Sequence, residues 1–141
     1  MFKALSLCCA ACLAAQLESP PQSAAQHVVL TLRVEGLSEV RGTLLAGIYD
    51  SAEGAFDPAN SRFGKRIPAD AGPMTLRFRL PPGDYAAAVI HDLNGNGKLD
   101  RNVFGIPREP YGFSNGAARP DFEKARFTIS RDTALTIKLQ R

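Results

Sequence analysis

Apolar and polar residues alternate along most of this chain, which is the pattern of β-strands that bury one face. Residues 27–35 show it clearly, because Val28, Leu30, Leu32 and Val34 share one face while polar side chains occupy the other. Every second residue of a strand faces the same side of the sheet, so the apolar set of each strand is expected to lie in one common core. The predicted strands are 27–35, 43–50, 73–80, 85–91, 123–130 and 133–140. The predicted core residues are Leu30, Leu32, Leu44, Ile48, Leu76, Phe78, Val89, Phe127, Ile129, Leu135 and Ile137.

Turn-forming residues separate these runs, and no stretch has the period of a convincing helix. Residues 51–72 and 103–121 show no regular pattern and are expected to be irregular. Short strands at this spacing favour an all-β fold, and 141 residues suffice for one domain with a real core. We expect a single prealbumin-like or immunoglobulin-like β-sandwich of about seven strands.

A tyrosine follows a proline-rich turn in the segment LPPGDY, which ends at Tyr85. This arrangement is similar to the tyrosine corner of β-sandwiches, in which the hydroxyl bonds to the preceding backbone. The alternative is a tyrosine that only packs against its neighbours.

The N-terminus has the pattern of a secretion signal. Lys3 supplies one positive charge, residues 4–15 are apolar but too short to span a membrane, and small residues follow. Cleavage after Ala25 is the first expectation, and cleavage after Ala14 or Ala15 is the alternative. Residues 1–25 are therefore predicted to be a signal peptide and residues 26–141 the folded domain. The protein is expected to be periplasmic or secreted, with no transmembrane segment.

All three cysteines lie within that signal, at Cys8, Cys9 and Cys12. A mature chain beginning at Gln26 would have no disulfide. Cys12 as a lipid-modified residue is the alternative. The formal net charge of +3 is small and its basic residues are scattered, which argues against binding to nucleic acid.

Oxygen-bearing side chains are densest in a loop directly after the strand predicted at 85–91. Asp92, Asn94 and Asn96 match the first, third and fifth positions of a calcium loop, Lys98 would offer its carbonyl at the seventh, and Asp100 fills the ninth. The twelfth position lacks the bidentate Glu, so a Ca²⁺ site here would be weak, with a dissociation constant on the order of 10⁻⁴ to 10⁻³ M.

The same loop also fits a purely structural role. Its Asn-Gly-Asn-Gly sequence supplies positive φ angles, and Asp and Asn side chains cap turns. A polar hairpin that folds around its own backbone therefore remains the alternative to a calcium loop.

The stretch from Ile90 to Asn115, IHDLNGNGKLDRNVFGIPREPYGFSN, resembles the signature of the DUF2141 family. The preceding Pro82-Gly83-Asp84-Tyr85 and the strands from Val28 onward are also similar to that family. The resemblance covers almost all of the predicted mature chain. It implies an uncharacterised, secreted bacterial protein and assigns no activity.

A looser similarity is to the calcium-binding B-type repeats of bacterial surface proteins, which have prealbumin-like sandwiches. Their loop reads D-x-N-x-D-G-x-x-D. Asp92, Asn94, Gly97 and Asp100 match this pattern, while Asn96 stands in place of its second Asp and removes one charge.

An acid–base site could be drawn from His91 and Asp92, but adjacent strand residues point to opposite faces and would not share a substrate. The sequence has no nucleophile elbow, zinc-ligand spacing or phosphate-binding glycine loop. We therefore expect a protein that is not an enzyme.

Two functions fit these patterns. The first is a calcium-stabilised structural or interaction module of the envelope. The second is a carbohydrate- or peptide-binding module that uses the loop 103–121. The residues expected to make contact in that second case are Glu109, Tyr111, Phe113 and Asn115. The expected partner is an envelope protein or a glycan. The chain contains no Trp, which weakens the case for sugar binding.

Overall fold

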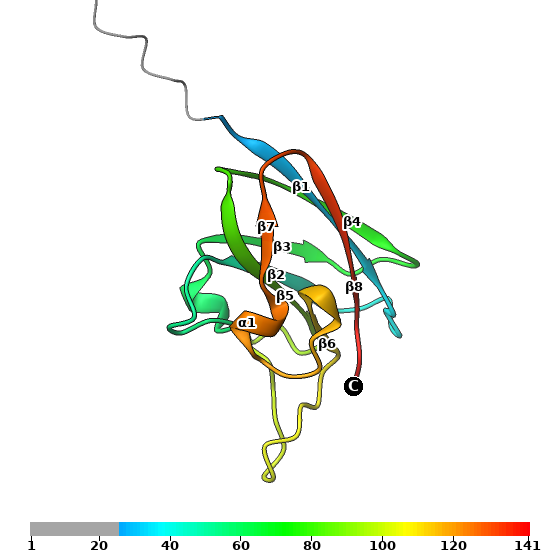
Figure 1. Cartoon of the computed structure of the whole chain (residues 1–141). Coiled ribbons are helices and arrows are strands. Elements are labelled where there is room, and N and C mark those ends of the chain that lie inside the picture. The colour runs from blue at the N-terminus through cyan, green and yellow to red at the C-terminus, as the bar shows by residue number, and fades with distance from the viewer. Residues whose placement is uncertain (1–25) are drawn as a thin grey trace, which may run out of the picture.

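Two β-sheets stack face to face in the computed structural model, which describes residues 26–141 (Figure 1). The smaller sheet has three strands in the order β4 (Met74–Leu80), β1 (Val28–Glu35) and β8 (Thr133–Lys138). In the larger sheet, β3 (Phe63–Pro68) pairs with β2 (Thr43–Tyr49), and β2 pairs with β5 (Gly83–Asp92). The predicted signal peptide and the three cysteines lie outside the described residues. The expected all-β sandwich is confirmed.

The central strand of the larger sheet is β5, and it carries three partners. Its far edge is shared end to end by β7 (Phe127–Ile129), which pairs with its beginning, and β6 (Tyr111–Phe113), which pairs nearer its end. In the smaller sheet, β1 is antiparallel to β4 and parallel to β8. The last strand, β8, thus pairs with the first strand, β1, and the long segment between β5 and β6 precedes it in the chain.

The core lies between the sheets and contains every residue that the alternation predicted for it. Leu30, Leu32, Leu44 and Ile137 are fully buried, whereas Phe127 is only partly buried, as is Leu135. Replacing one of the fully buried leucines by Ala is expected to cost about 2–5 kcal/mol of unfolding free energy.

Three elements differ from the sequence prediction. Residues 51–72 contain β3, and residues 103–121 contain β6, so both stretches are less irregular than expected. The first part of the strand predicted at 123–130 is instead the helix α1 (Phe122–Ala125), which begins where the Asp121 carboxylate accepts a hydrogen bond from the Lys124 N–H at 3.2 Å. Two short 3₁₀ turns, η1 (Pro58–Asn60) and η2 (Ser114–Gly116), complete the elements.

The tyrosine corner is present. The Tyr85 hydroxyl donates a hydrogen bond to the carbonyl of Pro81 at 2.8 Å, and its ring is buried. The turn before β5 is thereby fixed by a side chain of the strand itself. No helix within residues 26–141 has the length and apolar character needed to cross a membrane.

A second apolar cluster covers the outer face of the larger sheet. Its buried members are Tyr49, Ala86, Ala88, Phe113 and Ala125. Ser114 anchors the chain beside this cluster, because its hydroxyl accepts a hydrogen bond from the N–H of Ala87 at 2.9 Å and donates to the carbonyl of Ala125. Ser114, which directly follows β6, therefore fixes this part of the chain against β5.

Candidate functional site

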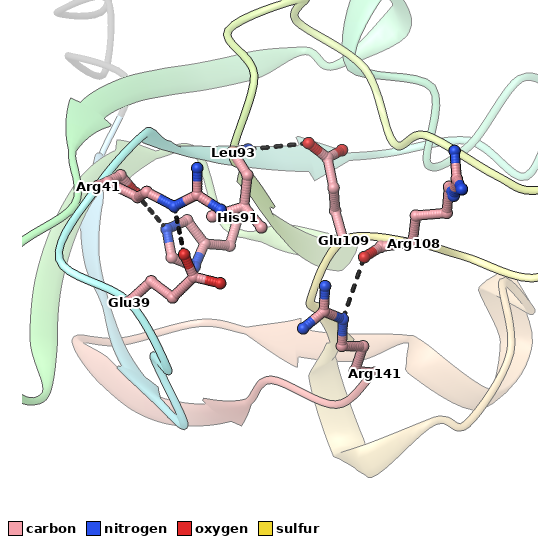
Figure 2. Close-up of polar contacts among 7 residues, drawn as sticks. All are labelled: Glu39, Arg41, His91, Leu93, Arg108, Glu109 and Arg141. Carbon is pink, nitrogen blue, oxygen red and sulfur yellow. Dashed lines mark hydrogen bonds and ion pairs between the residues drawn. The ribbon is translucent and has the colours of Figure 1, made fainter.

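The last two residues of β5 point to opposite faces of the sheet. His91 is in phase with the core residues Ala87 and Val89, and it is fully buried. Its Nε2 donates to the carbonyl of Arg41 at 2.7 Å, since a carbonyl can only accept (Figure 2). Its Nδ1 has no hydrogen-bond partner within the described part of the chain. His91 therefore holds the turn before β2 in place.

That turn carries an ion pair between Glu39 and Arg41 (Figure 2). The hydrogen bond from Arg41, with its positive charge, lowers the pKa of Glu39 below its ordinary value. Arg141 and His91 add a smaller electrostatic contribution in the same direction. Arg41 is exposed and Glu39 is partly exposed, and their ion pair serves the turn, so we assign them no catalytic role.

On the other face, the buried carboxylate of Asp92 forms the centre of the loop that follows β5. One oxygen accepts a hydrogen bond from the N–H of Gly95 at 2.7 Å, and the other accepts from the N–H of Gly97 at 2.8 Å. Both glycines have positive φ angles, 78° and 79°, which let the backbone turn its N–H groups inward. The loop is wrapped around this one carboxylate.

A second buried carboxylate, that of Glu109, closes the base of the loop. Oε1 accepts a hydrogen bond from the N–H of Leu93 at 2.8 Å, drawn in Figure 2, and Oε2 accepts from the N–H of Asp100 at 3.1 Å. Because the residue is only 4% exposed, these bonds compensate for the removal of a charge from water. The two ends of the loop are thereby joined by a single side chain.

The remaining predicted metal ligands also face one another. The side-chain amides of Asn94 and Asn96 both donate to the carboxylate of Asp100, the second at 2.7 Å. The amide oxygens accept from the backbone, that of Asn96 from the Lys98 N–H at 3.1 Å. The side chains of Asn94, Asn96 and Asp100 are therefore bonded to one another, while that of Asp92 is bonded to the loop backbone.

Within residues 26–141 no three side chains of His, Cys, Asp or Glu are grouped so that they could hold a metal ion. A calcium site built here would depend on amide and backbone oxygens in addition to its carboxylates. The calcium loop remains a prediction.

Beyond Asp100 the chain projects from the sandwich as a narrow hairpin, visible as the yellow loop at the bottom of Figure 1. Arg101 bridges to Pro107, and the N–H of Asn102 donates to the carbonyl of Ile106 at 2.9 Å. The side chain of Asn102 also accepts from the N–H groups of Phe104 and Ile106, at 2.9 and 3.0 Å. The turn is therefore ordered by its own hydrogen bonds.

Three large apolar side chains occupy the end of this hairpin and are left in solvent. Val103 is 93% exposed, Phe104 84% and Ile106 58%. We call these three residues the apolar tip. The sequence analysis did not single them out, although the signal was present, since V-F-G-I interrupts an otherwise polar, Gly- and Pro-rich stretch.

The residues predicted to bind a ligand from loop 103–121 lie closer to the sandwich. Glu109 is buried at the loop base, and Phe113 is buried with its ring 4.8 Å from that of Phe56. Tyr111 is half-buried and exchanges two backbone hydrogen bonds with Gln140, while Asn115 donates to the carbonyl of Arg126 at 2.6 Å. Glu109, Phe113 and Asn115 are thus engaged within the sandwich, while Tyr111 also lines a hollow with Ile106 of the apolar tip.

A groove of about 230 Å³ lies on the outer face of the larger sheet. Leu45, Ile90 and the ring of Tyr49 form its apolar walls, and Arg66 stands at its border. Burial raises the pKa of the Tyr49 hydroxyl well above its ordinary value, and the negative charge of Asp57 acts in the same direction. Tyr49 is therefore neutral in the folded protein at physiological pH.

Fold and site together define a β-sandwich with a projecting hairpin. The family model described as "Uncharacterized protein conserved in bacteria (DUF2141)" matches residues 32–138. The chain belongs to this family, as its long motif after β5 predicted. No curated protein and no solved structure matches the chain.

Proposed function

We propose that this chain is an exported, non-enzymatic binding module of the bacterial envelope, and that the apolar tip makes the contact. The observation that carries the proposal is the exposure of Val103, Phe104 and Ile106 side by side at the end of one hairpin. Single exposed apolar residues are common, but adjacent ones on a projecting element mark interaction sites.

The construction of the hairpin base supports this role. The buried carboxylates of Asp92 and Glu109 together accept four backbone hydrogen bonds in the segment that leads into the hairpin. A contact element held in a single orientation loses less conformational entropy on binding than a flexible loop. The proposed task of the oxygen-rich loop is therefore to orient the apolar tip.

The burial of His91 and Asp92 supports the non-enzymatic part of the proposal. His91 and Asp92, the pair from which an acid–base site could be drawn, lie on opposite faces of β5 and are both fully buried. His91 makes one hydrogen bond to the backbone, through Nε2, and both oxygens of Asp92 accept hydrogen bonds from the backbone. They support the fold and are not presented to a substrate.

Calcium belongs to the proposal as a stabiliser of the oxygen-rich loop. Asp92, Asn94, Asn96, the Lys98 carbonyl and Asp100 would be its ligands, and binding would require the two Asn amides to turn their oxygens toward the ion. In the extracellular affinity class, such binding adds stability without being needed for folding.

The alternative function, a carbohydrate- or peptide-binding module, places its contact in the same segment, residues 103–121. The apolar tip suits an apolar surface better than a sugar. The side chains of Val103, Phe104 and Ile106 have no hydrogen-bonding group, whereas a sugar presents hydroxyls that need hydrogen-bond partners. We therefore favour an envelope component that presents an apolar surface.

The proposal is tested by sedimenting the purified chain with total envelope fraction from the native host. Phe104→Ser is expected to reduce the bound share strongly. Val40→Ser is the matched control, because Val40 is also an exposed apolar residue, at 65%, on the turn between β1 and β2. Equal binding of the wild type and Phe104→Ser would overturn the proposed role of the tip.

A further inference from the structure

We propose that the partner of the apolar tip is the surface of an anionic phospholipid bilayer. The tip would enter the interfacial layer while arginines at its base bind lipid phosphates. This inference rests on the proposed function and names the partner. It is carried by the coincidence, on one hairpin, of exposed apolar residues and arginines that have no acidic partner.

Three arginines surround the hairpin. Arg101 and Arg108 lie on its two arms, and Arg119 lies on the neighbouring segment. None of the three forms an ion pair within residues 26–141, and residues 101–108 contain no Asp or Glu. Arginines without an ion pair also occur elsewhere in the described chain, such as Arg77 and Arg131, so it is the position beside the apolar tip that sets the hairpin arginines apart. The carboxylates of Asp100 and Glu109 flank the hairpin, but they accept hydrogen bonds from side-chain amides and backbone N–H groups. Between these two residues the hairpin carries positive charge alone.

Two of these arginines share a hollow with part of the apolar tip. Arg101 and Arg119 line a space of about 290 Å³ together with Ile106, Pro107 and Tyr111. Arg101 is oriented by a hydrogen bond from its Nη1 to the carbonyl of Gly105 at 2.9 Å. A guanidinium pairs well with a phosphate oxygen, and the adjacent apolar walls suit the start of an acyl chain.

The dimensions of the hairpin match those of a membrane interface. Phe104 follows Arg101 by three residues and lies in the turn that Asn102 orders, so its backbone is less than about 10 Å, the extended-chain limit, beyond that of Arg101. Interfacial elements bury their apolar groups about 5–10 Å into the boundary between headgroups and acyl chains. The order along the hairpin, apolar at the end and cationic at the base, is that of the bilayer itself.

A protein pocket is the competing partner, and the charge argues against it. A hydrophobic pocket in a protein would accept the tip without any need for arginines around it. Anionic lipids, in contrast, provide a layer of negative charge that attracts each nearby Arg, and this attraction weakens as salt screens it.

The chain contains no Trp, so Phe104→Trp introduces a single fluorescent reporter at the tip. The full chain carrying this substitution is mixed with protein-free vesicles of phosphatidylcholine alone or of phosphatidylcholine with phosphatidylglycerol. We expect a blue shift of the emission and cosedimentation with the anionic vesicles. Both signals should weaken as NaCl is raised from about 0.05 to 0.5 M, where the screening length falls severalfold.

Ser130→Trp is the control for the reporter, because Ser130 is exposed in the turn between β7 and β8, at the opposite end of the sandwich (Figure 1). Its emission should not shift. Both variants share the same N-terminal segment, so a difference between them reports on the hairpin. Arg101→Gln should weaken binding about fivefold, the effect of about one charge at the surface, whereas Arg131→Gln in the distal turn should not.

The outcomes separate this inference from the proposed function. Envelope binding that depends on Phe104, without binding to any vesicle, would leave the proposed function standing and reject the lipid. Equal binding to neutral and anionic vesicles would reject the role of the arginines. A dimer in sedimentation velocity that Phe104→Ser abolishes, with no vesicle binding, would assign the tip to a second copy of the chain. If Phe104→Ser binds both the envelope fraction and the anionic vesicles as well as the wild type does, both proposals are overturned.

Discussion

The carboxylate of Glu109 accepts a hydrogen bond from the backbone N–H of Leu93 at 2.8 Å, across sixteen residues of sequence. Its second oxygen reaches the N–H of Asp100, and the chain from Asp100 onward forms the projecting hairpin. The buried side chain of Glu109 therefore joins the end of β5 to the two segments from which the hairpin begins and ends. The orientation of the apolar tip depends on this contact.

Glu109→Gln is expected to lower the unfolding free energy by about 1–3 kcal/mol. Glutamine has one acceptor oxygen, so either the N–H of Leu93 or that of Asp100 would face the new amide N–H₂ without a bond. Urea denaturation followed by circular dichroism measures the change. Glu123→Gln is the control, since Glu123 is exposed and contacts only Arg126, and it should shift the midpoint little. Equal midpoints for wild type and Glu109→Gln would contradict the structural role of the contact.

Calcium is expected to raise the melting temperature of the chain by several degrees. If the dissociation constant is about 0.1 mM, then about 1 mM calcium contributes roughly 1.4 kcal/mol to the folded state. The increase should vanish in Asp92→Ala and shrink in Asp100→Ala, and magnesium should have less effect because it demands stricter octahedral geometry. Scanning calorimetry in calcium and in chelator checks this. Identical melting of the wild type in both would remove calcium from the proposal.

Asp92→Ala should also destabilise the chain in chelator, independently of any metal. The fully buried carboxylate accepts bonds from Gly95 and Gly97, and their N–H groups would lose this partner. We expect a loss of roughly 1.5–3 kcal/mol for hydrogen bonds to a charged group. A variant as stable as the wild type in chelator would show that the loop does not need this centre.

Stability should fall at alkaline pH because of Tyr49. In the unfolded chain its hydroxyl ionises near pH 10, while in the folded chain burial raises the pKa and keeps it neutral. The unfolded state therefore binds fewer protons above about pH 10, and the unfolding free energy falls there by up to about 1.4 kcal/mol per pH unit. Tyr49→Phe should lessen this fall without changing the stability at pH 7 by more than about 1 kcal/mol. An alkaline limb identical to that of the wild type would be evidence against the buried neutral hydroxyl.

The chain is expected to be exported and cleaved. The charged start, the short apolar run and the small residues before Gln26 predict a mature N-terminus near that residue. Mass spectrometry of protein isolated from the native host determines it. An intact Met1 on protein recovered from the cytoplasm would contradict export.

Local sequence pattern was sufficient to predict the sandwich and its core. Alternation with a period of two is a local property, and it assigns Leu30, Leu44 and Ile137 to buried faces whichever strands become neighbours. The turn around Asp92 is equally local, because its acceptors and glycines lie within five residues of one another. The tyrosine corner, from Pro81 to Tyr85, is local for the same reason.

The burial of the remaining residues depends on contacts that form only when distant segments of the chain come together. The short strand β6 exists because β5 offers it an edge, and Phe113 is buried because Phe56 packs against it from a distant loop. Glu109 joins the two ends of the loop because the chain folds back onto Leu93. Phe104 is exposed because no other segment within residues 26–141 covers the end of the hairpin. Burial depends on contacts between parts of the chain that are far apart in sequence, and local pattern does not specify them.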